Sequence, residues 1–193
     1  RSYNTGVFDI CEIDEDDSEN SEIKKKAEEK QCLPLTIVLP CYLPNEEEIL
    51  ELVLKFYEEQ LKKYPAESKI LIVWNSPNEH PEFERDMALW SSAEEMSKRG
   101  TSVQTICIRN RESTSKCDNL NMACKHIDTE LCCLNDADTM LDWATMIRGS
   151  HHISDGYDIA QAMNTHCKYD RNGTPGDENE RGCHPYGVLI TIG

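Results

Sequence analysis

Hydrophobic residues in this chain form two kinds of pattern, which alternate along the sequence. Short apolar runs indicate buried strands, whereas longer segments with an apolar residue every three or four positions indicate amphipathic helices. We predict strands at residues 35–39, 69–74, 103–108, 131–135 and 157–163. Helices are predicted between them, at residues 46–63, 81–99, 115–127 and 142–152.

The alternation of strands and helices predicts an α/β fold with a mostly parallel central sheet and helices on both faces. Local signals mark the helix ends. Asn45 is expected to cap the first helix, and Gly100 is expected to end the second. Ser115 and Asp118 have the spacing of a capping box at the start of the third helix. Residues 169–185 are rich in Gly, Asn, Asp and Pro, which predicts a loop.

The two ends of the chain differ from its middle. Residues 1–32 contain an acidic run at 14–19 and little that can be buried, so we predict a disordered, solvated leader. Residues 33–193 form the folded part. An apolar run at 187–193 has the pattern of a core strand, and a natural C-terminus seldom falls inside one. We therefore expect this chain to be a segment cut from a longer protein.

The charge of the chain excludes several classes of partner. It has 36 acidic and 20 basic residues, a formal net charge of −16. Nucleic acid and anionic lipid are bound by extended basic surfaces, so neither is an expected partner. No apolar run approaches the roughly 20 residues that span a bilayer. Any membrane attachment would lie in segments outside this chain, and the domain would then face the cytosol.

Ten cysteines are present, but their placement does not predict a disulfide framework. Cys107, Cys132 and Cys133 fall within apolar strand patterns, where cysteine acts as a small core residue. No Cys-x-x-Cys pair occurs, which leaves a zinc ribbon without support. We therefore expect a reduced, intracellular chain.

Two carboxylates one residue apart, Asp136 and Asp138, directly follow the apolar strand at 131–135. Open α/β sheets bind ligands at the carboxyl ends of their strands. Carboxylates are ligands for divalent cations, which in turn bind phosphates. The pair therefore predicts a site for a divalent metal and a phosphorylated ligand.

Other polar segments are expected at the same edge of the sheet. Residues 40–46 follow the first strand, and Asn75 follows the second. Arg111 and Lys116 lie between the third strand and its helix. Their charges, with the N–H groups that open this helix, can neutralise phosphates.

Three motifs occur in order along the chain. They are Pro-x-Tyr-x-x-Asn-Glu at 40–46, Ser-Lys-x-Asp-Asn-Leu-Asn at 115–121 preceded by Arg111, and Asn-Asp-Ala-Asp-Thr at 135–139. Together they resemble the family-two glycosyltransferases, which have the GT-A nucleotide-sugar fold. The second motif is most similar to the processive cellulose-synthase-like and chitin-synthase-like group. The resemblance covers residues 34–192.

The resemblance implies a metal-dependent glycosyltransferase. Its donor would be a nucleoside-diphosphate sugar, in the first place a UDP-sugar, and its acceptor a hydroxyl of a saccharide or another molecule, with inversion at the anomeric carbon. Asp138, together with Asp136, would coordinate Mn²⁺ or Mg²⁺ at the diphosphate. The remaining implied donor contacts come from the two earlier motifs: Pro40, Tyr42, Glu46, Arg111, Lys116, Asp118 and Asn121.

Two features depart from the family pattern. The acidic residue that usually holds the base after the second strand is replaced by Trp74-Asn75, although Asn75 still offers one acceptor and two donors to a uracil edge. The Trp-Asn pair also resembles the exostosin-like glycosyltransferases, which share the fold but not the stereochemistry. The family's catalytic base lies in the acceptor-binding half, which we expect beyond residue 193.

Two alternatives stay open. A non-catalytic nucleotide-sugar-binding module would need no acceptor half. A phosphatase of the haloacid-dehalogenase class also carries Asp-x-Asp after an apolar strand. That motif has Thr or Val two residues past the second Asp and lies on the first strand, whereas here Met140 has that position and the strand is the fourth.

Overall fold

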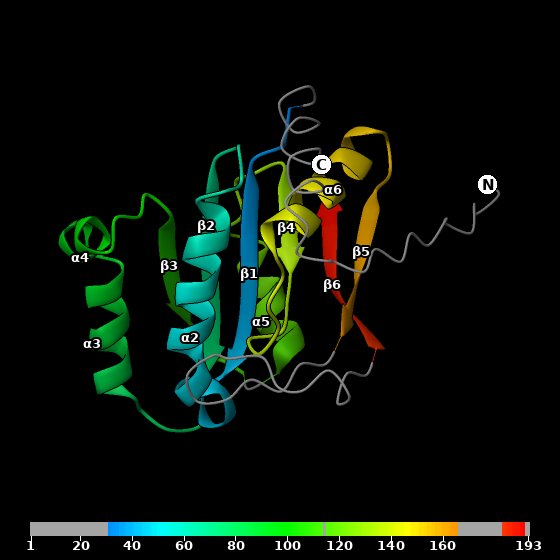
Figure 1. Ribbon diagram of the computed structural model, residues 1–193. Helices are drawn as coiled ribbons and strands as arrows, with labels where there is room; N and C mark the ends of the chain where they lie inside the picture. The colour runs from blue at the N-terminus through cyan, green and yellow to red at the C-terminus, as the bar shows by residue number, and fades with distance from the viewer. Residues whose placement is uncertain (1–30, 114, 166–182, 192–193) are drawn as a thin grey trace.

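A six-stranded sheet forms the centre of the protein (Figure 1). The computed structural model describes residues 31–113, 115–165 and 183–191. The strands are β1 (Leu35–Tyr42), β2 (Ser68–Asn75), β3 (Gln104–Arg109), β4 (Leu131–Leu134), β5 (Ile159–Thr165) and β6 (Cys183–Thr191). Their order across the sheet is β3-β2-β1-β4-β6-β5. The predicted leader lies almost wholly outside the described residues, as does most of the predicted loop at 169–185.

Strands β1 to β4 are parallel, and β6 runs antiparallel to both of its neighbours, β4 and β5. The prediction of a mostly parallel α/β sheet is thus confirmed. The apolar run near the end of the chain is a strand, as its pattern indicated. It begins at Cys183, so the prediction that the loop continues to residue 185 is wrong.

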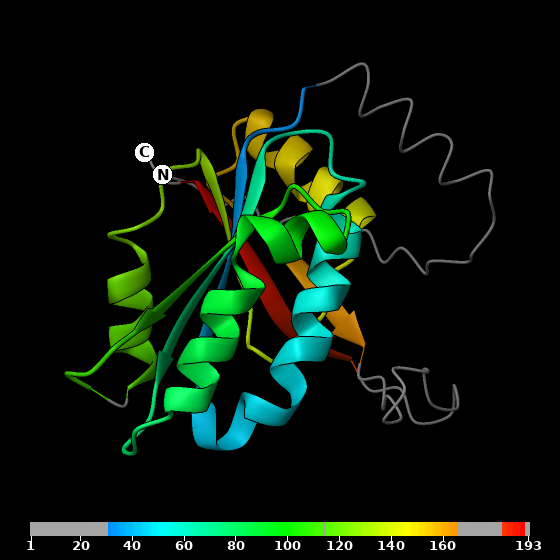
Figure 2. The ribbon, with the colours of Figure 1, turned by 90° about the vertical axis from the view of Figure 1, so that its left-hand side faces the viewer.

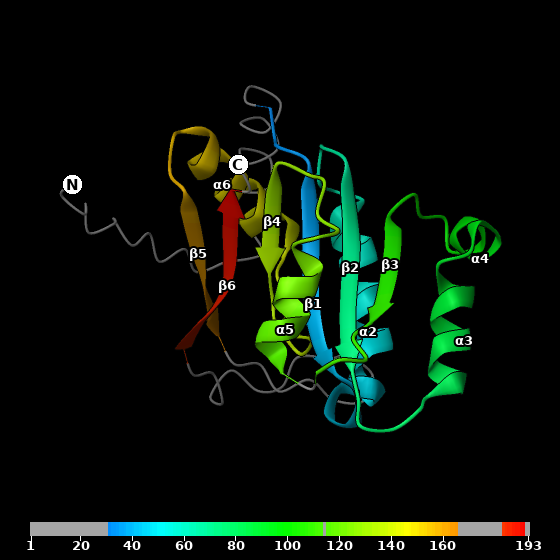
Figure 3. The same ribbon diagram turned by 180° about the vertical axis from the view of Figure 1, so that it is seen from behind.

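Helices cover both faces of the sheet. They are α2 (Leu43–Leu61), α3 (Pro81–Trp90), α4 (Ala93–Lys98), α5 (Lys116–Ala123) and α6 (Trp143–Ser154). Figure 2 shows α5 on one side of the sheet and α2 and α6 on the other, and Figure 3 shows α5 from its own side. The predicted arrangement of helices on both faces is confirmed.

Side chains of β1 alternate between two hydrophobic clusters, because successive residues of a strand face opposite sides. Ile37 and Leu39 point into the larger cluster, under α2 and α6, where Leu50 and Leu54 of α2 are fully or almost fully buried. Val38 points into the smaller cluster, which α5 covers. Cys32 is also buried in the larger cluster, so the chain is already packed against the core just before β1.

The first helix starts earlier than predicted. It begins at Leu43 with Pro44 in its first turn, a position that proline tolerates because the N–H there has no partner within the helix. The prediction that Asn45 caps this helix is wrong, since the N-cap residue is Tyr42. Instead of a side-chain cap, the N–H of Tyr42 donates to Oε2 of Glu46 at 2.5 Å.

The predicted helix at 81–99 is divided into α3 and α4, so the prediction of one continuous helix is wrong. Ser92 caps α4 by accepting a hydrogen bond from the N–H of Glu95. Gly100 follows α4 with a φ of +62°, a conformation that glycine adopts without strain. No helix within the described ranges is long and apolar enough to cross a lipid bilayer.

The start of α5 agrees with the prediction only in part. Ser115 is the N-cap residue, and its hydroxyl accepts from the N–H of Cys117. The reciprocal half of the predicted capping box is absent at this helix, because the Asp118 carboxylate accepts from the Ser113 hydroxyl at 2.5 Å. The helix ends at Ala123 and not at residue 127.

Candidate functional site

A pocket of about 200 Å³ opens at the carboxyl ends of β1, β2 and β4, next to the start of α5. We call it the donor-edge pocket. Its lining includes seven residues that the sequence predicted: Pro40, Tyr42, Glu46, Asn75, Lys116, Asp136 and Asp138. Two further lining residues, Cys41 and Asn119, were not predicted. Residues from four separate segments of the chain thus meet at one edge of the sheet.

The loop that carries the two aspartates is held in place by α2. The amide of Asn135 donates to the hydroxyl of Tyr57 at 2.5 Å, and this hydroxyl donates to the carbonyl of Thr139 at 2.9 Å. The N–H of Leu141 also donates to the Tyr57 hydroxyl, at 3.2 Å. Burial raises the pKa of Tyr57 far above its ordinary value, so the phenol stays neutral and keeps its proton for Thr139.

Charged groups of opposite sign meet across the mouth of the pocket. The Lys116 ammonium group forms an ion pair with Oδ1 of Asp136. Both side chains are partly exposed, 56% for Lys116 and 34% for Asp136, and Asp138 is exposed. An exposed ion pair is weak and contributes at most about 1 kcal/mol, so a ligand can exchange it readily.

Three buried asparagines join the strand ends behind the pocket. Oδ1 of Asn119 accepts from the amide groups of Asn75 at 3.0 Å and Asn110 at 3.1 Å. The amide of Asn119 donates to the carbonyl of Cys41 at 3.3 Å. One side chain of α5 therefore connects the ends of β1, β2 and β3. The sequence contained a signal that could have identified Asn119 as a buried residue of the site. Asn119 lies within the motif at 115–121, four residues before the buried Ala123 on the same helix.

The amide of Asn75 has a fixed orientation. Its Nδ2 donates to Asn119 and, at 3.4 Å, to the carbonyl of Ser115, so both N–H groups already have acceptors. Asn75 is 1% exposed, and among the described residues its Oδ1 has no hydrogen-bond partner. A buried carbonyl oxygen without a partner destabilises a protein unless a ligand or water supplies a donor.

Glu46 occupies the opposite wall of the pocket. Its carboxylate accepts from the N–H of Tyr42, which ties the start of α2 to the end of β1. Burial and then the nearby Glu46 charge raise the pKa of the Cys41 thiol far above its usual range. Cys41 therefore lines the pocket as a neutral thiol and not as a nucleophile.

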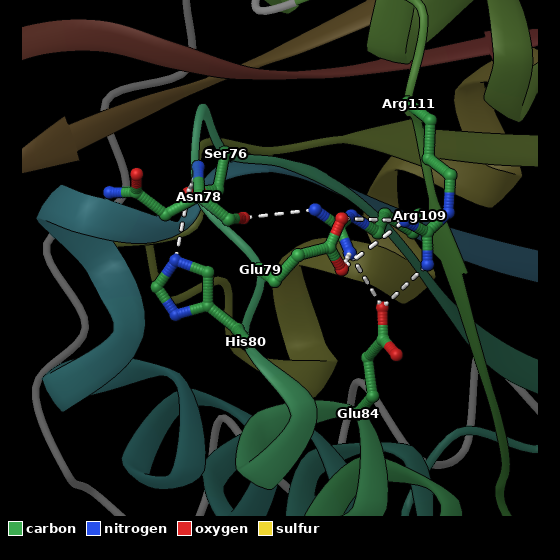
Figure 4. A network of polar contacts seen from close by, with 7 residues as sticks. All are labelled: Ser76, Asn78, Glu79, His80, Glu84, Arg109 and Arg111. Carbon is green, nitrogen blue, oxygen red and sulfur yellow. Dashed lines mark hydrogen bonds and ion pairs between the residues drawn. The ribbon is translucent and has the colours of Figure 1, made fainter.

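Three predicted residues lie outside the pocket. Arg111 pairs with Glu79 and Glu84 in a network next to it (Figure 4). Asp118 accepts from Ser113, and Asn121 is exposed on α5. These side chains are near the pocket in sequence, but the structure does not bring them into its lining.

Arg109 is the centre of the network in Figure 4. Its Nη1 binds Glu79 and, at 3.0 Å, Glu84, and its Nη2 donates to the carbonyl of Asn78 at 2.9 Å. Hydrogen bonding to Arg109 lowers the pKa of Glu79 below its ordinary value. The two arginines and two glutamates balance one another in charge.

The donor-edge pocket suits a metal only in combination with a ligand. Across the described ranges, no three His, Cys, Asp or Glu side chains are grouped to hold an ion. Asp136 and Asp138 offer two carboxylates. Mg²⁺ and similar hard cations are commonly held by one or two carboxylates and the phosphates of a substrate. The residues present fit an ion held in that way.

The sequence matches no family model and no curated protein. Solved structures do match it. CMP:2-keto-3-deoxy-manno-octonic acid synthetase complexed with CTP has 10% sequence identity and a TM-score of 0.50, over 82% of this chain and 74% of that one. The 4-diphosphocytidyl-2C-methyl-D-erythritol synthase from Anaerococcus prevotii has 9% identity and a TM-score of 0.50, over 81% and 70%.

A mannosyltransferase from Pyrobaculum calidifontis, in complex with GDP-mannose and Mn²⁺, has 16% identity and a TM-score of 0.48. That match covers 68% of this chain and 38% of the mannosyltransferase. The likeness to the two synthases shows the fold. The chain has the same α/β fold as these two synthases, with a mainly parallel central sheet flanked by helices.

Proposed function

We propose that this chain is the donor-binding part of a glycosyltransferase domain and binds a UDP-sugar together with Mn²⁺ or Mg²⁺. The observation that carries the proposal is the donor-edge pocket, where Asp136 pairs with Lys116 and Asp138 lies in the same lining, at the carboxyl ends of parallel strands. Oxygen ligands for a metal and a cation for phosphate are what a nucleoside diphosphate requires.

In this proposal the diphosphate displaces Lys116 from Asp136. The ammonium group then binds a phosphate oxygen, with help from the N–H groups that open α5. Asp136 is released to act with Asp138 as a metal ligand. When bound, the metal supplies Lewis-acid stabilisation of the charge on the departing nucleoside diphosphate.

The base end of the donor lies at Asn75 in the same proposal. Its Oδ1 is buried and lacks a partner among the described residues, so it accepts an N–H of the base. Pro40 and Tyr42 line the adjacent wall. Arg111, Asp118 and Asn121, which the family resemblance implied as donor contacts, are left outside the contact set.

Transfer of the sugar requires a base that takes the proton of the acceptor hydroxyl. Among the residues that the structure describes, the carboxylates that line the pocket are Glu46, Asp136 and Asp138. Glu46 accepts from Tyr42, and the proposal assigns the aspartates to the metal. We therefore assign the base to the acceptor-binding part of a longer protein. The same observation favours a second candidate, a nucleotide-sugar-binding module without transfer activity.

Calorimetric titration tests the donor site directly. UDP, GDP and CDP are titrated with Mn²⁺ and again with EDTA, into the natural chain and into Asp138→Asn. Asp86→Asn is the control, because Asp86 is an exposed aspartate on α3. We expect metal-dependent binding of UDP that is lost in Asp138→Asn and kept in Asp86→Asn. No binding of any nucleotide by folded protein would refute the donor site.

Two further incubations separate the remaining functions. With UDP-sugars and water, slow release of UDP indicates a transferase site, whereas tight binding without release favours the binding module. With CTP and a sugar phosphate, formation of a CDP-sugar and pyrophosphate would assign the pocket to nucleotidyl transfer instead.

A further inference from the structure

A second pocket of about 420 Å³ lies at the edge of the sheet, between β3 and α3, and shares no lining residue with the donor-edge pocket. We call it the α3–β3 pocket. Figures 1 and 3 both show α3 standing beside β3 at this edge. Within the described residues β3 pairs with β2 alone, so its other edge is not paired with a strand.

The shape of the pocket follows from which residues face one another. The register pairs Thr105 with Ile70 and Cys107 with Ile72, so both side chains point to the face that α3 covers. The opposite wall is formed by one face of α3 and its C-cap residue, and it presents the small side chains of Ala88 and Ser91 beside Glu84 and Met87. Because small side chains line both walls, the space between β3 and α3 is not filled.

Two buried polar atoms in the lining have no partner. Thr105 is 4% exposed, the Arg109 side chain is 10% exposed, and both line the pocket. Among the described residues, Oγ1 of Thr105 and Nε of Arg109 make no hydrogen bond. Such atoms are rare in folded proteins, and each destabilises the ligand-free state.

The charges around the pocket are already balanced. Nη1 and Nη2 of Arg109 donate to Glu79, Glu84 and Asn78, whereas Nε makes no hydrogen bond among the described residues (Figure 4). Because Glu79 and Glu84 also neutralise Arg111, a charged ligand would find no counter-charge. The chemistry of the lining selects an uncharged ligand.

The remaining lining is mainly apolar. Met87 and Trp74 contribute hydrophobic surface. Burial raises the pKa of the Cys107 thiol to about 12, so it is a neutral apolar group and not a nucleophile. Pockets of roughly 300–1,000 Å³ with an apolar lining and a few convergent polar groups are typical binding sites for small molecules.

We propose that the α3–β3 pocket binds an uncharged apolar amide. Its carbonyl accepts from Nε of Arg109, its apolar part lies against Met87 and Cys107, and a second polar group meets the hydroxyl of Thr105. The same chemistry is offered by a free small molecule and by the main chain of an extended peptide along the open edge of β3. The proposal is independent of the donor site.

Nuclear magnetic resonance titration tests the proposal with two probes. N-benzylacetamide represents the free small molecule, and the blocked tripeptide acetyl-Val-Leu-Val-amide represents the extended peptide. We expect at least one probe to shift the amide signals of β3 and α3 in a saturable way. Saturation by the small probe alone assigns a free molecule, and tighter binding of the tripeptide assigns a peptide; both results support the pocket.

Matched variants locate the binding. Ala88→Phe fills the pocket and should abolish the shifts, whereas Leu89→Phe, at an exposed position of the same helix, should not. Thr105→Val removes the unpartnered hydroxyl, so it should raise the melting temperature of the free protein and weaken probe binding roughly fivefold. Thr36→Val removes a buried hydroxyl that is bonded to Thr129 at 2.7 Å, so it should lower the melting temperature and leave binding unchanged.

Two results would overturn the proposal. One is the absence of saturable shifts from both probes. The other is equal binding by Ala88→Phe and the natural chain, which would place the probes elsewhere. A lower melting temperature for Thr105→Val would show that its hydroxyl has a partner, and would overturn the argument from unpartnered atoms.

Discussion

The two pockets of this protein hold their charged groups in different ways. In the donor-edge pocket, Lys116 and Asp136 form one exposed ion pair across the opening. In the α3–β3 pocket, Arg109 is largely buried and bound by two carboxylates and a carbonyl. The first arrangement favours a charged ligand that replaces an existing pair. The second favours an uncharged ligand that fills space and leaves the charges in place.

The comparison also extends to the scaffold behind each pocket. Asn119 and Tyr57 connect the donor-edge pocket to the core through several hydrogen bonds each. The lining of the α3–β3 pocket has fewer such connections, and Thr105 has none among the described residues. We therefore expect substitutions to affect stability most behind the donor-edge pocket.

The largest effect is expected from Asn119→Ala. It leaves the amide groups of Asn75 and Asn110 without their shared acceptor in a buried position. We expect the free energy of unfolding to fall by about 2–4 kcal/mol, measured by urea denaturation. Asn121→Ala, at an exposed position of the same helix, should change it by less than about 0.5 kcal/mol. Equal effects would mean that the asparagine network does not hold the strand ends.

Tyr57→Phe should have the next largest effect. It removes the hydroxyl that binds Asn135, Thr139 and Leu141, so the free energy of unfolding should fall by about 1–3 kcal/mol. The loop with the two aspartates should also bind Mn²⁺ with UDP less tightly. Tyr64→Phe is the control, because its hydroxyl binds the carbonyl of Leu33, away from the pocket. It should reduce stability without changing Mn²⁺ affinity.

Lys116→Met should separate metal binding from nucleotide binding. Without nucleotide, Asp136 has lost its competitor, so affinity for Mn²⁺ measured by electron paramagnetic resonance should rise about two- to fivefold. With Mn²⁺ present, affinity for UDP should fall roughly tenfold, because a charge-assisted bond to phosphate is lost. If the variant changes both affinities in the same direction, the proposal that a diphosphate displaces Lys116 from Asp136 is wrong.

The smallest effect concerns Glu79 and the rim of the α3–β3 pocket. Because Arg109 lowers the pKa of Glu79 from its ordinary value of 4.5, this carboxylate contributes stability above pH 4.5 and loses it as the pH falls through the lowered value. Glu79→Gln should therefore melt slightly below the natural chain at pH 7. The difference in melting temperature should vanish in acid, and a constant difference would show that charge is not its cause.

Local pattern predicted much of this structure because burial acts on neighbouring residues. Short apolar runs located most ends of β1 to β4 to within one or two residues, and Ser115 caps α5 as predicted. The antiparallel insertion of β6 between β4 and β5 was not predictable in this way. The position of β6 depends on pairing between segments that are far apart in the sequence, and the hydrophobic pattern within one segment does not indicate its partner strands.

The division between α3 and α4 shows why other details were missed. No Pro or Gly marks residues 91–92, so the sequence indicated one helix. The break is stabilised from a distance, because Arg99 donates to the carbonyl of Trp90 at 2.8 Å and pairs with the buried Glu58 of α2. Arg111 is similar. Its charge suggested a phosphate, but the fold places Glu79 and Glu84 beside it.

The hydrogen bonds between Tyr57 and the loop that carries Asp136 and Asp138 also affect the conformational entropy of that loop. Fixing the backbone of one residue lowers its conformational entropy by an amount equivalent to about 1–2 kcal/mol. Because the Tyr57 hydroxyl already orders the backbone at Thr139 and Leu141, that loss occurs when the chain folds and not when a ligand arrives. If a ligand binds at Asp136 and Asp138 as proposed, it meets a loop that is already ordered, so ordering the loop does not reduce its affinity.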